Sequence, residues 1–368
     1  MGTVIQLKNQ INNSYFQLRN SVEEKLILVE EKIKSKLFSK VELVQKMTDY
    51  HLDTGGKRLR ALLTLGSAKM CGYVKGSRDI NLAACVELIH SATLMHDDVI
   101  DNGSIRRGKK TLNKVWDNHS SVLVGDYLLS RCFEMMVEDG NIEVLKLLSS
   151  TSSKIAQGEI LQVQHKGEVD MLEETYLKII SAKTAELFAA ATKVGAILSD
   201  MKNREKEALE FYGRNLGLTF QIADDTLDYN SELKLFGKKI GQDFFEGKIT
   251  LPIILLFQIA ANHEKERLNE IFKKKTREDS DLDLGSFQSE NIEENSEQSS
   301  LRMPPPKLGF SIPPWWFSWF FALVPLVLWF CKDKSTPQVA APALPKNLPV
   351  NPQERLVLFI EHFEAYCL

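Results

Sequence analysis

Apolar residues recur every three or four positions along most of the first 275 residues, as in Leu26, Val29 and Ile33. This spacing places apolar side chains on one face of an α-helix. The segments that show it are 15–50, 79–101, 119–137, 142–166, 172–199, 203–230 and 250–273. Because no segment shows the sustained alternation of apolar and polar residues that is typical of strands, the pattern predicts an all-α fold.

Proline and glycine mark the ends of the predicted helices. Of the 12 prolines, only Pro252 precedes residue 303, and proline is rare inside helices because it lacks the N–H group and clashes with the preceding turn. Glycine-containing sequences separate the helical segments, namely GKRLR, DNGSIRRGKK, HKGEVD and GKKIGQDFFEGK. We therefore predict that residues 1–278 form one helical domain.

The composition changes abruptly at residue 279. Residues 279–311 are first acidic and then proline-rich, which predicts a disordered linker. Residues 312–331 carry no charge, and 20 such residues in a helix would cover about 30 Å, the thickness of a bilayer core. Two interpretations fit this segment: a membrane span or embedded hairpin that anchors the protein, or a fused tail with no selected role. Residues 332–368 form a proline-rich tail.

Charge and cysteine content narrow the classes of function. The net charge of −3 and the pI near 6.2 give no indication of a nucleic-acid partner. The five cysteines have no metal-ligand spacing, which favours reduced thiols. The N-terminal sequence lacks the apolar region of a secretory signal. We expect a cytoplasmic protein, with a membrane anchor if residues 312–331 enter a bilayer.

Two acidic clusters with the pattern D-D-x-x-D lie in apolar sequence, where an unpaired charge costs several kcal/mol. The first aspartate cluster is Asp97, Asp98 and Asp101, and the second aspartate cluster is Asp224, Asp225 and Asp228. On a helix, the first and last members of each set share a face. Mg²⁺ suits such oxygen ligands, usually binds one or two carboxylates, and completes its shell with water and phosphate. A single set is more often a solvated helix face, whereas two sets predict that facing clusters hold a polyphosphate through Mg²⁺.

Cationic residues at glycine-rich helix ends fit the same chemistry. They are Lys57, Arg58, Arg60, Arg106, Arg107, Lys183, Lys238 and Lys248. Arginine binds phosphate oxygens in pairs, lysine adds a point charge, and helix N-termini also favour anions. Each alone is more often a surface charge, but together they predict a diphosphate site. His90 lies seven residues before Asp97 and hence on nearly the same helix face, so we favour a ligand role for it over a core role.

Five motifs in order resemble the trans-type polyprenyl diphosphate synthases, in particular the bacterial octaprenyl-like members. They are GGKRLR, ELIHSATLMHDDVIDNGSIRRG, KTAELF, FQIADDTLD and GQDFFEGKITLP, and they cover roughly residues 15–275. The resemblance implies an antiparallel helical bundle around a central cavity, the isoprenoid synthase fold, in a homodimer. It also implies a transferase that condenses isopentenyl diphosphate with an allylic diphosphate into a long all-trans polyprenyl diphosphate, in isoprenoid and quinone side-chain biosynthesis.

The resemblance implies roles for individual residues. The six aspartates would bind Mg²⁺ and take part in catalysis, with Lys183 as a further catalytic residue. The residues that match the isopentenyl diphosphate pocket are Lys57, Arg60, His90 and Arg107. The residues that match the allylic side are Arg106, Lys183, Thr184, Gln221, Lys238 and Lys248. Ala92, five residues before Asp97, is small, as in family members that make long chains.

The chain departs from the family pattern after about residue 280, where further helices would normally follow. We therefore expect the helical domain to be incomplete at its C-terminal end. Two alternatives stay open: a catalytically impaired fusion or truncated synthase that acts as a membrane-associated subunit, and a synthase of geranylgeranyl length. A terpene cyclase fits poorly, because Lys57, Arg60 and His90 form a second-substrate pocket that a cyclase does not require.

Overall fold

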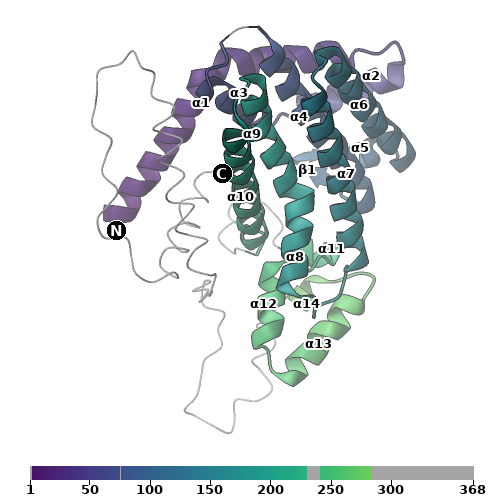
Figure 1. The fold of residues 1–368 in the computed structure, drawn as a ribbon. Coiled ribbons are helices and arrows are strands. Elements are labelled where there is room, and N and C mark those ends of the chain that lie inside the picture. The colour runs from purple at the N-terminus through teal and green to yellow at the C-terminus, as the bar shows by residue number, and fades with distance from the viewer. Residues whose placement is uncertain (1, 75, 230–240, 283–368) are drawn as a thin grey trace. The chain divides into compact units, whose positions relative to one another are not determined.

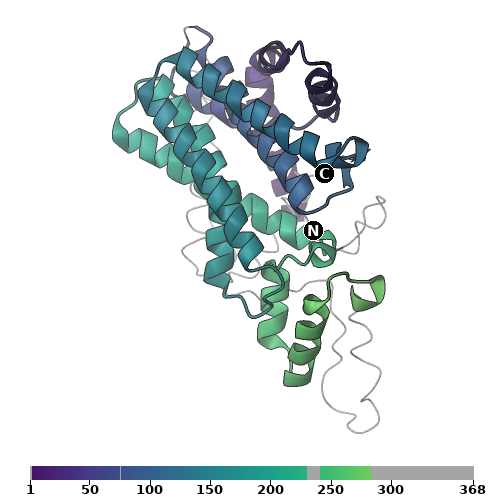
Figure 2. The same ribbon diagram turned by 90° about the vertical axis from the view of Figure 1, so that its right-hand side faces the viewer.

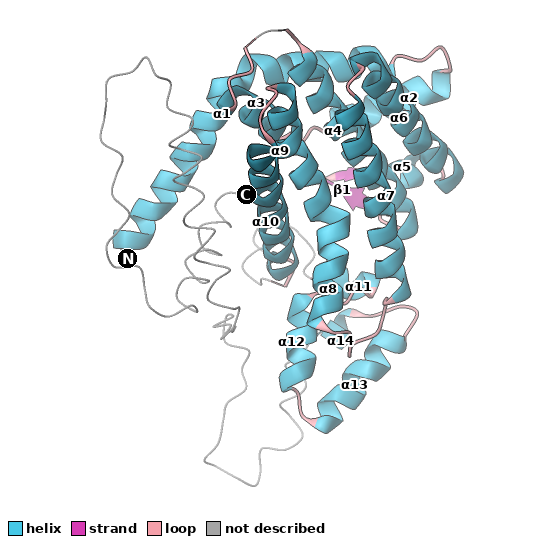
Figure 3. Ribbon diagram, viewed as in Figure 1, coloured by secondary structure: helices cyan, strands magenta, loops and turns pink. Residues whose placement is uncertain are grey.

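The computed structural model describes residues 2–74, 76–229 and 241–282, and most of these residues lie in helices (Figures 1 and 3). The helices are α1 (Gly2–Leu37), α2 (Glu42–Asp53), α3 (Leu59–Met70), α4 (Arg78–Ile100), α5 (Leu112–Val115), α6 (Asn118–Asp139), α7 (Ile142–Gln164), α8 (Glu173–Ile180), α9 (Glu186–Leu198), α10 (Asn203–Leu227), α11 (Gln242–Glu246), α12 (Leu251–Ile259), α13 (Asn262–Lys273) and α14 (Asp279–Leu282). A single π-helical turn, η1 (Ser181–Ala185), separates α8 from α9. The predicted all-α fold is confirmed.

One small hairpin was not predicted. Strands β1 (Ile105–Arg106) and β2 (Lys109–Lys110) pair antiparallel within the sequence that we interpreted as a loop. The two turn residues, Arg107 and Gly108, both have positive φ, at 50° and 75°. Two successive positive φ values are typical of the tight turns that match the twist of a hairpin. The hairpin therefore fixes where Arg106 and Arg107 lie.

The chain divides into two compact units. The first unit comprises residues 13–156 and 182–217, and the second comprises residues 1–12, 157–181 and 218–368. The division falls within α1, α7, η1 and α10, and each unit is described by itself below. The predicted linker 279–311 lies almost entirely outside the described residues, and the apolar segment 312–331 and the tail 332–368 lie wholly outside them, so these assignments stay predictions.

The core of the first unit is built around α4, which packs against α3, α6 and α9, and α3 also packs against α9 (Figure 2). The middle of α4 is apolar on most of its circumference, and residues 82–89 are all buried. A helix that is apolar all round belongs in the interior, because it has no face suited to water. Small residues allow close contact between the helices: Gly195 of α9 lies against the backbone of α3 at Ser67 and Ala68.

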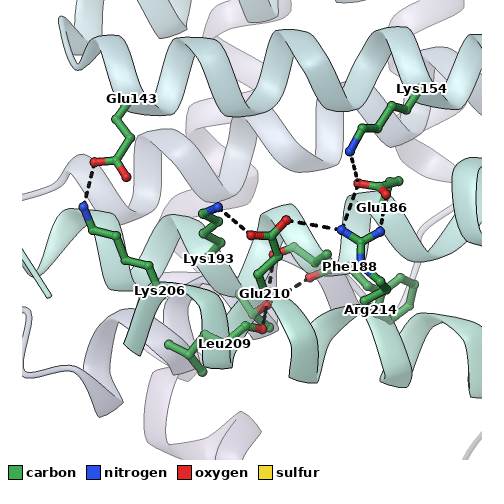
Figure 4. A network of polar contacts seen from close by, with 11 residues as sticks. Glu143, Lys154, Glu186, Phe188, Lys193, Lys206, Leu209, Glu210 and Arg214 are labelled. Carbon is green, nitrogen blue, oxygen red and sulfur yellow. Dashed lines mark hydrogen bonds and ion pairs between the residues drawn. The ribbon is translucent and has the colours of Figure 1, made fainter. Parts of the chain in front are cut away.

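A charged network joins α7, α9 and α10 of the first unit (Figure 4). Glu186, buried at the start of α9, accepts hydrogen bonds from Arg214 of α10 and from Lys154 of α7, the latter at 3.2 Å. Glu210 of α10 accepts from Lys193 of α9 at 2.5 Å. Because Glu186 follows η1 directly, the network fixes the orientation of the helix turn that carries Lys183 and Thr184.

In the second unit, α8 contacts α12, and aromatic rings join α11 to α13. The rings of Phe244 and Phe272 lie edge to face, with centroids 5.3 Å apart. Among the described residues, no helix combines the length and apolar character needed to cross a membrane. The predicted span 312–331 lies outside the residues to which this finding applies.

Candidate active site

The first aspartate cluster forms the C-terminal end of α4. Asp101 is the residue that caps the helix, and its N–H donates to the carbonyl of Asp97 at 2.8 Å. Asp98 is held by Arg106 of β1, whose Nη2 donates to Asp98 Oδ1 at 2.7 Å and whose Nε donates to Oδ2 at 3.1 Å. The Arg106 guanidinium thus occupies the carboxylate of Asp98 in a paired arrangement, the strong geometry for such ions.

Lys183 places a second cation at this end of α4. Its Nζ lies 3.6 Å from Oδ2 of Asp97, and both side chains are largely shielded from solvent. Lys183 and the buried Thr184 lie in η1, and single π turns inside helices are frequent at functional sites. The motif KTAELF placed both residues among the candidates, but nothing in the sequence signalled the π turn that aims Lys183 at Asp97.

The N-terminal end of α3 lies beside the same helix. Its Arg58 and Arg60, together with Arg107 from the turn of the β1–β2 hairpin, form the guanidinium cluster. Burial lowers the pKa of Arg60 to about 10, and the charge of Arg107 adds to the effect, so the side chain stays protonated at neutral pH. Its guanidinium lies 4.6 Å from the centre of the Phe188 ring, and its Nε is buried without a hydrogen-bond partner in the described structure. A buried cation with an unused donor fits an anionic ligand.

Two histidines border the guanidinium cluster. Burial and the charges of Arg60 and Arg107 lower the pKa of His90 well below its usual value of 6.5. Burial, followed by Arg107 and Arg58, lowers the pKa of His51 to about 4. Both imidazoles are therefore neutral at pH 7 and offer hydrogen bonds rather than charge. His51 was not predicted, because it belongs to no motif and only the fold brings it to these arginines.

The glycine pair of GGKRLR makes room for Arg107. Gly55 has a φ of +67°, which side chains disfavour. A Cβ on Gly56 would lie 2.8 Å from Nη1 of Arg107, and this same guanidinium donates to the carbonyl of Gly55. Lys57 follows the pair and is exposed. The structure thus brings Arg60, His90 and Arg107 together in the first unit, while their roles stay predictions.

The second aspartate cluster lies in the second unit, and its three members have unequal surroundings. Asp224 is exposed, whereas Asp225 is buried. Asp225 accepts from Gln221 Nε2 and from the Tyr176 hydroxyl, each at 2.7 Å. Burial raises the pKa of Asp225 to about 7, against the effect of these two hydrogen bonds. Tyr176 of α8 was not predicted, since it lies 49 positions away and carries no motif.

Asp228 connects the second aspartate cluster to α11. Its Oδ2 accepts from the backbone N–H of Asp243 at 2.9 Å, and its carbonyl accepts from Gly241. Lys248, just beyond α11, pairs with Glu246 at 2.7 Å, and its charge opposes the rise that burial causes in the pKa of Asp225. The predicted site residue Lys238 lies outside the described residues.

The aspartates fit Mg²⁺, but they supply only part of the ligands that the ion needs. Within the described ranges, no group of three or more His, Cys, Asp and Glu side chains is arranged to hold a metal ion. Carboxylate oxygens are nevertheless the ligands that Mg²⁺ prefers, and the ion commonly takes only one or two of them before phosphate and water complete its shell. The two aspartate clusters lie in different units, and the predicted bridging of both by one polyphosphate stays a prediction.

A helical fold with an aspartate cluster and a guanidinium cluster beside one buried helix defines an enzyme of the isoprenoid synthase class. The model of the polyprenyl synthetase family matches residues 41–284. The chain belongs to the polyprenyl synthetase family and is a prenyltransferase. The predicted family, fold class and type of enzyme are therefore confirmed.

Individual relatives agree with this assignment. The chain is 42% identical over 222 residues to octaprenyl diphosphate synthase of Escherichia coli, covering 60% of this chain and 68% of the relative. It is 42% identical over 228 residues, 62% of this chain and 70% of the relative, to an all-trans-nonaprenyl-diphosphate synthase of Rhodobacter capsulatus. A crystal structure of polyprenyl synthase from Caulobacter crescentus, complexed with calcium and isoprenyl diphosphate, matches with a TM-score of 0.69 at 40% identity, over 72% of this chain and 80% of that one.

Proposed function

We propose that this prenyltransferase condenses isopentenyl diphosphate with an allylic diphosphate and forms a long-chain all-trans polyprenyl diphosphate of octaprenyl-like length. The single observation that carries the proposal is the arrangement along α4. The Asp97–Lys183 and Asp98–Arg106 pairs lie at its end, and His90, beside the guanidinium cluster, lies two turns earlier. The relatives named for octaprenyl and nonaprenyl products support the long chain, and the comparisons do not favour the impaired-subunit or geranylgeranyl-length alternatives.

Lys57, Arg60, His90 and Arg107 bind the diphosphate of isopentenyl diphosphate in this proposal. The unused buried Nε of Arg60 supports the assignment, because a diphosphate oxygen would satisfy it. Neutral His90 contributes a hydrogen bond without adding to the repulsion among the arginines. The phosphate charge would also relieve that repulsion, since like charges in partly buried positions destabilise one another.

In this proposal, the aspartate clusters bind the allylic diphosphate through Mg²⁺. Mg²⁺ held by these carboxylates would supply charge neutralisation of the diphosphate leaving group. Of the protein groups, Arg106 and Lys183 stabilise the negative charge that develops on that leaving group. Further contacts come from the other residues assigned to the allylic side, which are Thr184, Gln221, Lys238 and Lys248.

The chemistry needs no protein nucleophile. The allylic C–O bond breaks to give diphosphate and an allylic carbocation, which the double bond of isopentenyl diphosphate attacks. The attack leaves a tertiary carbocation on the isopentenyl unit. The neighbouring carbon then loses a proton to the released diphosphate, and a new double bond forms. The buried side chains of α4 exclude water, so that the carbocation is not quenched.

Asp97→Ala and Asp224→Ala test the proposal. Each variant should lose turnover by orders of magnitude in a Mg²⁺-dependent assay with labelled isopentenyl diphosphate and an allylic primer, because each loses a carboxylate that helps to hold the leaving group. Mass spectrometry of the wild-type product should show a long polyprenyl chain. Full activity in both variants would contradict the metal assignment, and a wild-type protein without any product would contradict the function.

A homodimer and a membrane contact complete the proposal. The surface of α6 supports the dimer, because Phe133 and Val137 are exposed apolar residues one helical turn apart, and adjoining apolar surface often marks an interface. The uncharged segment 312–331 supports the contact of an otherwise cytoplasmic enzyme with membranes. Sedimentation of the full chain and flotation with liposomes, each with and without residues 279–368, test these two assignments.

A further inference from the structure

Glu87 is a buried carboxylate on α4. It is the first residue of the motif ELIHSATLMHDDVIDNGSIRRG, but neither the resemblance nor the proposed mechanism gives it a role. Its side chain is only 4% exposed, and it lies one turn before His90. A buried charge without partners costs several kcal/mol, so a carboxylate persists in such a place only where other groups satisfy it. The partners of Glu87 therefore indicate its role.

Both partners of Glu87 belong to the start of α3. Oε1 accepts a hydrogen bond from the backbone N–H of Ala61 at 3.0 Å, and Oε2 lies 3.7 Å from Nη1 of Arg58. Ala61 is the third residue of α3, and the first N–H groups of a helix have no partner within it. The N-cap residue Arg58 has a φ of 50°, and its side chain makes no capping bond. Glu87 thus caps α3 from a neighbouring helix.

The turn that Glu87 caps carries Arg60. Burial alone disfavours the charged guanidinium of Arg60, and the nearby carboxylate of Glu87 opposes this effect. The guanidinium packs on the Phe188 ring, and its buried Nε has no hydrogen-bond partner in the described structure. Glu87 therefore favours the charged form of Arg60 but forms no hydrogen bond with its Nε in the described structure.

We propose that Glu87 is a positioning residue for the diphosphate of isopentenyl diphosphate: it holds the start of α3 and supplies the counter-charge that keeps Arg58 and Arg60 close together before the anion binds. This role rests on the proposed function, in which Arg60 binds that diphosphate. Because Glu87 contacts Arg58 and Ala61 at the start of α3 and not the reacting atoms, it acts on binding rather than on the chemical step.

Three variants separate positioning from general stability. Glu87→Ala removes both the acceptor and the charge, whereas Glu87→Gln keeps an oxygen for the Ala61 N–H and removes only the charge. Asp79→Asn is the matched control, because Asp79 is another buried acid of α4 and pairs with Lys25 of α1. It lies eight residues before Glu87, which is about 12 Å along a helix.

The expected result is a selective change in KM. Glu87→Ala should raise the KM for isopentenyl diphosphate about tenfold, the equivalent of one lost hydrogen bond to a charged group, and Glu87→Gln about threefold. The kcat and the KM for the allylic primer should stay within about twofold of wild type. Asp79→Asn should lower the urea midpoint of unfolding and leave all three kinetic constants unchanged.

Titration calorimetry with inorganic diphosphate in EDTA provides a readout independent of turnover. Affinity should fall about tenfold in Glu87→Ala and stay unchanged in Asp79→Asn. Diphosphate binding that depends on Glu87 in a protein that makes no product would support this inference while the proposed function fails. If the wild-type protein makes product and folded Glu87→Gln keeps an unchanged KM for isopentenyl diphosphate, the inference is overturned while the proposed function stands. The inference would also be overturned if Glu87→Gln and Asp79→Asn both lowered stability and kcat and raised both KM values to the same extent. If Glu87→Ala does not fold, Glu87→Gln alone decides the test.

Discussion

Replacing Gly195 with alanine should force α3 and α9 apart. An added Cβ would lie 2.4 Å from the backbone N of Ala68 and 2.7 Å from the carbonyl carbon of Ser67, both in α3. Backbone atoms cannot rotate away as the end of a side chain can. The two helices must therefore separate by about 1 Å to restore a contact distance of about 3.5 Å. The separation also pulls Arg60 of α3 from the Phe188 ring of α9.

Two opposing effects set the size of this change. Alanine favours a helix by about 1 kcal/mol over glycine, whereas overpacking a core costs about 1–3 kcal/mol and occasionally more. The contact at Gly195 is with backbone, so the clash dominates and we expect a net loss of about 2 kcal/mol. Gly66 of α3 is the matched control, because it is also buried and helical, but a Cβ there meets only the flexible end of Leu18 at 2.9 Å. Gly66→Ala should stay within about 1 kcal/mol of wild type.

Urea denaturation followed by circular dichroism measures both variants, with the KM for isopentenyl diphosphate as a second readout. Gly195→Ala should lower the free energy of unfolding and raise this KM, because Arg60 loses its support. Gly66→Ala should change neither quantity appreciably. A Gly195→Ala protein as stable as wild type would refute the reasoning, since α3 and α9 could then not be in backbone contact.

Three further substitutions give separate tests. Ala92→Phe should shorten the product, because Ala92 is fully buried five residues before Asp97; an unchanged chain length by mass spectrometry would contradict this. Burial lowers the pKa of His51 from 6.5 to about 4, so its contribution to stability is complete above pH 6.5 and falls by up to about 3 kcal/mol towards pH 4. Urea titrations between about pH 7 and pH 5 should therefore show a smaller loss in His51→Gln than in wild type, and equal losses would count against the assignment. Tyr176→Phe removes a 2.7 Å hydrogen bond to Asp225, a loss of about 1–3 kcal/mol; the Mg²⁺ concentration for half-maximal turnover should rise, and an unchanged value would argue against a role for Tyr176.

The long helices could be predicted because their apolar stripes are continuous. Segments 79–101, 119–137 and 142–166 agree with α4, α6 and α7 to within two residues at each end. Segment 15–50 instead covers parts of both α1 and α2. The break between them contains neither glycine nor proline, and apolar residues continue through it. There the backbone N–H of Ser39 donates to the Gln45 side chain at 2.9 Å, a bond that no periodicity predicts.

The chemical identity of the candidate site could be predicted, but the unequal surroundings of its residues could not. The pattern D-D-x-x-D treats Asp97 and Asp98 alike, yet Arg106 holds only Asp98 in a paired arrangement. In the second cluster, Tyr176 and Gln221 hold Asp225. Gln221 lies one helical turn before Asp225, but Tyr176 and Arg106 come from other elements, and their separation in sequence from the aspartates follows no spacing rule. Glu87 stands in a quoted motif, but its role could not be predicted for the same reason, because its capping bond joins two different helices.

The charges of the first unit fit the proposed binding of two anionic substrates beside one buried helix. At the end of α4, the three carboxylates of the first aspartate cluster outnumber Lys183 and Arg106, so this end lacks positive charge. At the start of α3, the three guanidinium groups outnumber the carboxylates of Glu87 and Glu30. His90 adds no charge at neutral pH. Like charges repel more strongly where water is excluded. In the proposed function, a divalent cation with its diphosphate would therefore stabilise the end of α4, and a diphosphate without metal would stabilise the start of α3.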